Sequence, residues 1–389
     1  MKNGVNMKNI NMDNKKKILF VTDYLPNAKN SVGDILHSIL DYCQRKGVEP
    51  VLVQYNNRLA DNIEMCYYDN LKVYSGSKSV NRIIRIVNSV RNVILRFFRL
   101  YNTFIRKKIF LNLKDIIKKE NPALVVFFIY TPDIKCASIC EDMYVKFIIL
   151  LYDTFLSRPG VEKEQTMITE KTLIEKSYGY LVPSFFYKEY SNCYDQKKLL
   201  SYNLPLVIER EQVVDAFNCT ADGYDFLYLG QIQQFRNLEK IKVLFNQMNL
   251  KLHVFTSQDL ESDSIFQIHS AVSGMDMYKL VAHSKFLVAF DNSFPYAHYL
   301  PSKSYLYVSF TKPVIAFGDN DESALKDFFS DYRLFFYQNI NKPLDKLIEF
   351  INNNTETSFD EQIYNQYVQF TPSVSSYNIV EKFFELSGL

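Results

Sequence analysis

The 389-residue sequence contains no tryptophan, and its six cysteines are scattered rather than grouped. Cys136 and Cys140 are spaced for one face of a helix, but no second Cys or His pair completes a zinc site. The five histidines show no metal-ligand spacing either. We therefore expect reduced thiols, no bound metal and no cofactor.

Long hydrophobic runs and an excess of one charge are also missing. No uncharged apolar run reaches the length that spans a membrane, and the polar N-terminus lacks the apolar core of a signal peptide. The net charge is only +2, so the molecule as a whole is not a polyanion binder. A hydrophobic content of 47% with 23% charged residues is typical of a soluble globular protein. We expect a cytoplasmic location.

What the chain does contain is an alternation of short apolar runs with longer amphipathic stretches. Several runs, such as VVFFIY and FIILLYD, are apolar on both faces, as strands of a parallel sheet covered by helices must be. This alternation predicts doubly wound α/β domains. The expected strands are Ile18–Thr22, Pro50–Gln54, Ala123–Tyr130, Val145–Tyr152, Tyr178–Val182, Leu199–Tyr202, Phe226–Leu229, Leu252–Thr256, Phe286–Phe290, Pro313–Phe317 and Leu334–Tyr337, and the expected helices include Asp34–Lys46, Leu238–Met248, Asp276–His283 and Ala324–Phe329.

The pattern weakens once, around Ser201–Asp225, before a new strand begins in DFLYLG. A chain of this length is long for one hydrophobic core, so we expect two domains. We place a Rossmann-like domain at residues 1–205, a second at 206–370, and a terminal helix at 371–389 that packs back towards the first. Such a pair leaves a ligand-binding cleft between the carboxyl ends of the strands.

The segment GQIQQFRNLEKI, from Gly230 to Ile241, places a cation beside a helix start. A strand ends at Gly230, a polar loop follows, and Arg236 stands just before the next helix. Backbone N–H groups and a guanidinium can converge there on one anion. Taken alone, the motif is better explained by a solvated arginine at a helix start.

A second cationic helix start follows in LPSKSYLYVSFTKPVIAF. Ser302 can cap this helix or donate its hydroxyl, and Lys303 can neutralise a leaving phosphate. The Lys312–Pro313 pair then ends the helix. Two cationic helix starts on successive units should open at the same edge of the sheet. Together they predict a donor diphosphate site made of Gly230, Arg236, Ser302 and Lys303.

Four further residues are candidates for catalysis and for the acceptor side. Asp153 ends the FIILLYD strand, where a carboxylate can orient an acceptor hydroxyl, act as a base, or simply cap a loop. His298 lies in a loop expected to face the cleft. Gly33 and Asp34 follow the first strand, where glycine lets the backbone approach a ligand. We expect Asp153 and His298 to be catalytic, and Gly33 and Asp34 to lie on the acceptor side.

The segment from Asn70 to Lys114 is rich in Lys and Arg and contains no acidic residue. At helical periodicity its basic side chains fall on one side and its apolar ones on another, which suits an anionic membrane surface. Its aromatic residues are not interleaved with the basic ones, so nucleic acid is disfavoured. The alternative is an ordinary helix with a basic outer face. We predict peripheral membrane contact through Arg82, Arg85, Arg96, Arg99, Arg106 and Lys107.

Residues 175 to 320 resemble GT-B fold glycosyltransferases, most closely the large retaining group, glycosyltransferase family four-like, that includes many bacterial capsule and lipopolysaccharide enzymes. YLGQIQQFRNLEKI resembles that family's diphosphate loop, with Arg236 where the family usually has Lys. LPSKSYLYVSFTKPVIA resembles its "P-x-K-x-x-E" helix, and MYKLVAHSKFLVAFDNS the strand before it. Leu306 departs from the pattern, because the family has there a Glu that holds the nucleotide ribose.

The resemblance implies a GT-B architecture and an enzyme that transfers a hexosyl or related group from a nucleotide diphosphate donor to an acceptor, with retention of configuration. Cationic clamps would replace a metal. With the basic helix on the inner face of the cell membrane, a lipid-linked glycan acceptor in surface polysaccharide synthesis fits. Two alternatives stay open: a degenerate GT-B scaffold that binds a nucleotide sugar, favoured by Leu306, and a nucleotide-sugar 2-epimerase, which has no use for a membrane anchor.

Overall fold

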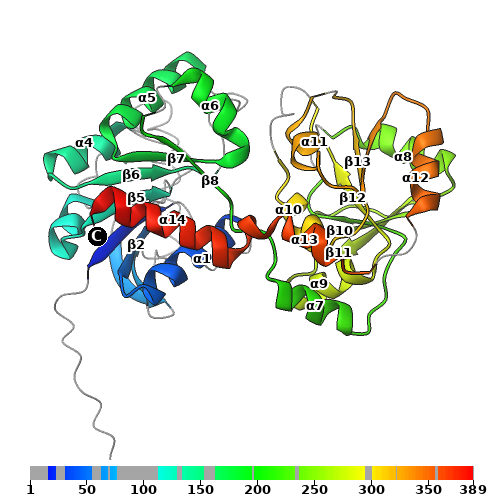
Figure 1. The fold of residues 1–389 in the computed structure, drawn as a ribbon, viewed down its shortest axis with the longest axis horizontal. Coiled ribbons are helices and arrows are strands. Elements are labelled where there is room, and N and C mark those ends of the chain that lie inside the picture. Colours follow the sequence, from blue (N-terminus) through cyan, green and yellow to red (C-terminus); the bar gives the residue numbers. More distant parts are fainter. Residues whose placement is uncertain are drawn as a thin grey trace, which may run out of the picture.

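The computed structural model describes residues 16–22, 31–54, 63–68, 71–76, 113–128, 134–152, 163–194, 197–232, 236–293, 300–320, 322–354 and 358–388. They form two lobes, each built on one β-sheet with helices on both faces (Figure 1). This confirms the predicted α/β fold with two doubly wound sheets. Within the described residues, no helix is both long and apolar enough to cross a membrane.

The first lobe contains an eight-stranded sheet of order β3-β4-β2-β1-β5-β6-β7-β8. Its strands pair in parallel except β3, which runs antiparallel to β4 at the edge. The strands are β1 Lys17–Thr22, β2 Glu49–Gln54, β3 Ile63–Tyr68, β4 Leu71–Gly76, β5 Leu124–Phe128, β6 Phe147–Leu150, β7 Gly179–Pro183 and β8 Leu199–Tyr202. The helices include α1 Ser31–Arg45, α4 Ile134–Asp142, α5 Lys163–Lys176 and α6 Tyr187–Cys193, with a short 3-10 turn, η2, at Ser184–Phe186.

The second lobe contains a six-stranded, fully parallel sheet of order β11-β10-β9-β12-β13-β14. The strands are β9 Phe226–Leu229, β10 Leu252–Thr256, β11 Phe266–Ser270, β12 Phe286–Phe290, β13 Val314–Gly318 and β14 Phe335–Asn339. The helices are α7 Arg210–Asn218, α8 Leu238–Gln247, α9 Gly274–His283, α10 Lys303–Ser309, α11 Ala324–Phe328, α12 Asp345–Asn353 and α13 Glu361–Asn365, with a 3-10 turn, η3, at Val368–Phe370.

The central strands are buried on both sides, which explains their continuous apolar sequences. In β12 all five residues are buried. Phe286, Val288 and Phe290 belong to the same apolar cluster as the buried face of α8, whereas Leu287 and Ala289 belong to the cluster that contains α10. Successive side chains of a strand point to opposite faces, so each run must be apolar throughout when helices cover both faces.

The last helix, α14 (Pro372–Ser387), returns to the first lobe and lies beside α1 (Figure 1). The ring of Phe383 packs 6.1 Å from that of Phe20 on β1, and Lys46 forms an ion pair of 2.8 Å with Glu381. This confirms the predicted crossing of the terminal helix. The chain thus passes between the lobes twice, and the predicted boundary at residue 205 lies between β8 and α7.

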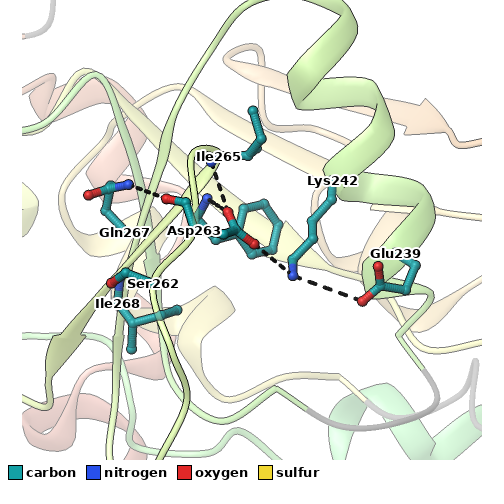
Figure 2. Close-up of polar contacts among 8 residues, drawn as sticks. Glu239, Lys242, Ser262, Asp263, Ile265, Gln267 and Ile268 are labelled. Carbon is teal, nitrogen blue, oxygen red and sulfur yellow. Dashed lines mark hydrogen bonds and ion pairs between the residues drawn. The ribbon is translucent and has the colours of Figure 1, made fainter.

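Strands β3, β4 and β11 were not predicted from the sequence. Strand β11 is polar because it lies at the edge of its sheet, and the turn before it is fixed by Asp263 (Figure 2). The carboxylate of Asp263 accepts hydrogen bonds from the N–H groups of Ile265, at 2.8 Å, and Phe266, at 2.6 Å, and pairs with Lys242 of α8 at 2.9 Å. This cluster lies at the amino ends of the strands and stabilises the fold on the edge opposite to the candidate site.

Candidate functional site

Each sheet has one point where the strand order reverses: between β1 and β5 in the first lobe, and between β9 and β12 in the second. Doubly wound folds bind ligands outside the carboxyl ends of the strands at such points. In the first lobe, the start of α1 follows β1 there. In the second lobe, Gly230 follows β9, and Asp291 and Asn292 follow β12.

Gly230 forms a sharp turn at the end of β9, with Lys303 packed against it. Its φ of +120° is one that other residues rarely adopt. A Cβ added to Gly230 would lie 3.5 Å from Cε of Lys303 and 4.0 Å from the phenol oxygen of Tyr228. The first residue of α10 therefore lies directly beside the turn that ends β9, so two of the residues predicted to bind a diphosphate are neighbours.

The guanidinium of Arg236 spans the switch point of the second lobe. On the β9 side, Nη1 donates to the phenol oxygen of Tyr228 at 2.8 Å and to the backbone oxygen of Gln231 at 3.2 Å. On the β12 side, Nε donates to Oδ1 of Asn292 at 3.0 Å. Because Tyr228 also borders the Gly230 turn, Arg236 and Lys303 lie around the same turn, as expected for two helix starts that open at one edge.

Asp34 of α1, in the first lobe, interacts electrostatically with Lys303 beside the Gly230 turn. Surrounding protein raises the pKa of its carboxyl, and this rise is opposed by the positive charge of Lys303 and then by His37. Burial lowers the pKa of Lys303, opposed by the negative charge of Asp34. Asp34 nevertheless remains exposed to water. The switch points of the two lobes therefore face each other closely enough for their charges to interact.

The remaining predicted residues have different placements. Gly33 is buried in the first turn of α1. Ser302 precedes α10 but makes no side-chain cap, so the prediction of a capping hydroxyl is wrong. Ser302 itself already has helical dihedral angles, and the N–H of Ser304 bonds to the backbone oxygen of Pro301 at 2.9 Å instead. The other predictions fall outside the described residues: Asp153, His298, Arg82, Arg85, Arg96, Arg99, Arg106 and Lys107.

Leu306, which stands where the resembled family has a ribose-binding Glu, is only 5% exposed and packs in the hydrophobic core. Its neighbour Tyr307 fixes α10 to the sheet: the phenol accepts from the N–H of Leu229 at 3.3 Å and donates to the oxygen of Val288 at 3.1 Å. Position 306 therefore offers a ligand no hydrogen-bond acceptor in its side chain.

Three polar residues of the site were missed by sequence reasoning: Tyr228, Asp291 and Asn292. Asp291 and Asn292 are only 1% and 2% exposed, although both are polar. The sequence does contain an indication of these two residues: the Asp-Asn pair directly follows the apolar strand FLVAF, which places two polar side chains at the carboxyl edge of the sheet. Tyr228 lies inside an apolar strand and gave no such signal.

Metal-ligating side chains do not gather in the described part of the chain: no group of three or more His, Cys, Asp or Glu residues there could hold an ion. The charged groups identified at the facing switch points are instead the cations of Arg236 and Lys303, the carboxyl of Asp291 behind Asn292, and the carboxylate of Asp34 opposite them. Such an arrangement can bind an anion in the second lobe beside a group in the first.

No protein-family model matches the sequence, and a search of curated proteins found none that is similar to it. Solved structures are similar over nearly the whole chain. A glycosyltransferase from Rickettsia africae has a TM-score of 0.66 at 13% identity, covering 96% of this chain and 99% of that one. Sucrose-phosphate synthase from Thermosynechococcus elongatus has a TM-score of 0.66 at 9% identity, with the same coverage. UDP-GlcNAc 2-epimerase from Methanocaldococcus jannaschii has a TM-score of 0.56 at 11% identity, covering 95% and 99%.

At these identities the likeness concerns the fold, which glycosyltransferases and epimerases share. The likeness covers 96% of this chain, and therefore both lobes. The protein therefore has the GT-B fold.

Proposed function

We propose that this protein is a glycosyltransferase that moves a sugar from a nucleotide diphosphate donor to a glycan acceptor. The observation that carries the proposal is the pairing of Arg236 and Lys303 around the Gly230 turn, at the switch point of one lobe and opposite Asp34 of the other. A diphosphate bound there would receive two positive charges, and the acceptor would approach from α1.

The chemistry requires stabilisation of a leaving diphosphate, on which negative charge increases as the glycosidic bond breaks. Preorganised cations stabilise such charge without a metal, so the proposed reaction is metal-independent and uses no cofactor. Lys303 suits this role because burial lowers its pKa, and a bound anion would restore the preference for its charged form. We include retention of configuration in the proposal only because the sequence resembles a retaining family.

The acceptor side of the proposal combines Gly33 and Asp34 of α1 with Asp153 and His298 as catalytic candidates. A lipid-linked glycan acceptor follows from the basic segment, through which the protein would bind the inner, anionic surface of the cell membrane. Synthesis of a surface polysaccharide such as capsule or lipopolysaccharide would place donor, acceptor and membrane together.

Two alternatives have observations in their favour. UDP-GlcNAc 2-epimerases from Methanocaldococcus jannaschii and Rickettsia bellii share the fold, at TM-scores of 0.56 and 0.51. An epimerase would invert C2 of the bound sugar and need no membrane. The buried Leu306 favours the other alternative, a scaffold that binds a nucleotide sugar without turnover.

A screen of nucleotide sugars tests the proposal. Wild-type protein should release nucleoside diphosphate from one donor, and Arg236→Ala and Lys303→Gln should each lower kcat/KM by about 10- to 100-fold, as expected for hydrogen-bonded charges. Lys240→Gln changes an exposed lysine of the same lobe and serves as the control. Normal turnover by Arg236→Ala would refute the phosphate site. Epimerisation at C2 without release of diphosphate would support the epimerase, and binding without any turnover the scaffold.

Vesicle binding tests the membrane part separately. Replacing Arg82, Arg85, Arg96 and Arg99 by Gln should release the protein from anionic vesicles, because each basic residue near such a surface contributes about 1 kcal/mol. Unchanged binding would end the proposal of a membrane anchor and leave the donor site untouched.

A further inference from the structure

The guanidinium of Arg236 is held by the protein itself at the switch point of the second lobe. Its Nη1 and Nε atoms donate to acceptors on two different strands' ends, Tyr228 of β9 and Asn292 after β12, at 2.8 and 3.0 Å. Forming such bonds costs the long arginine side chain conformational freedom. Because the bonds are formed in the structure without a ligand, the guanidinium is already positioned before any ligand binds.

The two acceptors are themselves fixed. Tyr228 is 3% exposed, its ring stacks on that of Phe290 at 4.2 Å, and its hydroxyl donates to the backbone oxygen of Gln231 at 2.8 Å. The phenol thus accepts from the guanidinium and donates onward, an arrangement in which each bond strengthens the other.

Asn292 is held from behind by Asp291. The N–H of Asn292 donates to Oδ1 of Asp291 at 2.9 Å, and Oδ2 of Asp291 accepts from the hydroxyl of Tyr337 at 2.8 Å. The backbone oxygen of Asn292 accepts from Asn320 at 2.6 Å. With Asn292 2% exposed, its side-chain oxygen has little freedom to leave the guanidinium.

The acceptors in these bonds, namely a phenol, an amide and a backbone carbonyl, are all uncharged. These three bonds orient the guanidinium without adding a negative charge beside it, whereas a carboxylate at the position of Asn292 would do both. Electrostatic catalysis depends on charges that are fixed in place before the reaction. A flexible cation loses conformational entropy when it binds the ligand, and this loss reduces the net binding energy.

We propose that Tyr228 and Asn292 are positioning residues that hold Arg236 in place, still charged, for the diphosphate of the donor. This inference rests on the proposed function and adds to it the reason why Arg236 can act. Its distinguishing consequence is that neither residue matters to anion binding once Arg236 is gone.

Calorimetric titration of the full-length protein with UDP, GDP, ADP and inorganic pyrophosphate tests the inference by a double-mutant cycle. Tyr228→Phe keeps the stacked ring and removes one of the bonds that Arg236 donates, together with the phenol's own bond to Gln231. Affinity for the best probe should therefore fall about 3- to 10-fold, against about 10- to 100-fold for Arg236→Ala. In the Arg236→Ala background, Tyr228→Phe should have no further effect. Tyr332→Phe removes a buried phenol bond at the opposite edge, to the oxygen of Lys312, and should leave binding unchanged.

Asn292→Asp separates orientation from charge. The new carboxylate would keep an acceptor for Nε but offset the positive charge of the guanidinium and repel the anion, so affinity for the same probe should fall about tenfold or more although the free protein melts normally. Near-normal binding by Asn292→Asp would show that the uncharged acceptor has no significance, and would overturn this part of the inference.

Chemical rescue gives a readout that a merely structural role would not change. Millimolar guanidinium added to Arg236→Ala should restore part of the probe's affinity, and it should fail to do so when Tyr228→Phe and Asn292→Ala are also present. The inference would be overturned if the losses of affinity in the double-mutant cycle were additive, or if guanidinium rescued Arg236→Ala equally well with and without Tyr228 and Asn292. Either result would leave the diphosphate site intact. If wild type binds none of the four probes, the proposed function fails, and the inference with it.

Discussion

The carboxylate of Asp34, on α1 of the first lobe, and the ammonium of Lys303, on α10 of the second, shift each other's pKa across the space between the lobes. Each has a pKa moved by surrounding protein towards its neutral form, and each opposes that shift in the other. A diphosphate bound beside Lys303 would compete with Asp34 for the same cation. The pair therefore connects occupancy of the donor site to a residue of the acceptor lobe.

Asp34→Asn should strengthen binding of the nucleoside diphosphate, because the variant lacks a negative charge that repels the ligand and attracts Lys303. We expect a gain of about 2- to 5-fold, the size of a solvent-exposed ion pair, in calorimetric titrations at low salt. The gain should shrink as salt is added, since the charge of Asp34 is exposed. Weaker binding by Asp34→Asn would mean that Asp34 contacts the ligand through a hydrogen bond.

Lys312 should make stability depend on pH in the alkaline range. The side chain is 1% exposed, and burial lowers its pKa to about 8. In the unfolded chain the pKa returns to its ordinary value of 10.5, so the unfolded state binds more protons between these values and stability rises with pH there. Below about pH 8 the full cost of the buried charge remains. Lys312→Met should therefore be more stable than wild type at pH 7, by roughly 1 to 3 kcal/mol.

This advantage of Lys312→Met should diminish in urea titrations repeated towards pH 10. Lys346→Met, which changes an exposed lysine of α12, is the matched control and should show no such trend. A constant difference between Lys312→Met and wild type at all pH values would show that Lys312 is not desolvated in the folded protein.

Glu170 should be essential to the first lobe. Its carboxylate is fully buried and accepts from the hydroxyls of Tyr180, Tyr190 and Tyr194 at 2.6, 2.9 and 2.7 Å. Glu170→Gln replaces one acceptor oxygen by a donor that faces phenol groups, and should destabilise the protein by about 2 to 4 kcal/mol. Urea titration checks this, with exposed Glu175→Gln on the same helix as control. A loss below half a kcal/mol, in the order of a surface substitution, would contradict it.

The histidine pair of the second sheet should weaken the protein in mild acid. Nδ1 of His253 and Nε2 of His269 lie 3.0 Å apart, and burial lowers both pKa values, that of His253 also through the charge of His269. Since the folded pKa values lie below the ordinary value of 6.5, stability is complete above that pH and is lost as pH falls through the folded values. His269→Phe should lose less stability than wild type between pH 7.5 and 5, as measured by urea unfolding.

Exposed His37→Asn, on α1, is the control for that comparison. Equal acid losses in His269→Phe and wild type would show that other groups cause the pH dependence.

The sequence was sufficient for most of the sheet cores, because strands buried on both faces are apolar at every position. Phe226–Leu229 and Phe286–Phe290 are buried throughout and have the predicted bounds. Leu199–Tyr202 and Leu252–Thr256 also have the predicted bounds, although they are only partly buried. Strand β11 escaped prediction for the opposite reason. FQIHS in β11 has one side without a neighbouring strand, so half of it tolerates polar residues, and its position is set by the Asp263 turn rather than by hydrophobicity.

For the site, the sequence indicated which helix starts carry cations but not what holds them. Arg236 and Lys303 lie around the Gly230 turn. The sequence predicted that they would lie close together, because parallel strands end at one edge of a sheet. Tyr228 was not assigned because it lies in the apolar strand β9, whose residues are expected in the core. The contact of Asn292 with Arg236 joins residues 56 positions apart, a pairing that no local spacing indicates. Of the two roles predicted for Ser302, cap or hydroxyl donor to the diphosphate, the cap followed from residue type alone, yet Ser302 itself has helical dihedral angles and makes no side-chain cap. The hydroxyl donor stays a prediction.

The return of α14 to the first lobe has a consequence for biosynthesis. Ile379, Val380 and Phe383 are fully buried in the same cluster as Ile35, Leu36 and Ile39 of α1, so the first lobe is completed by a segment that is translated after the second lobe. While the ribosome translates the second lobe, the apolar side of α1 has no covering helix. A premature stop codon before α14 would therefore leave the first lobe with an open core, prone to aggregation although the strands of its sheet precede the stop.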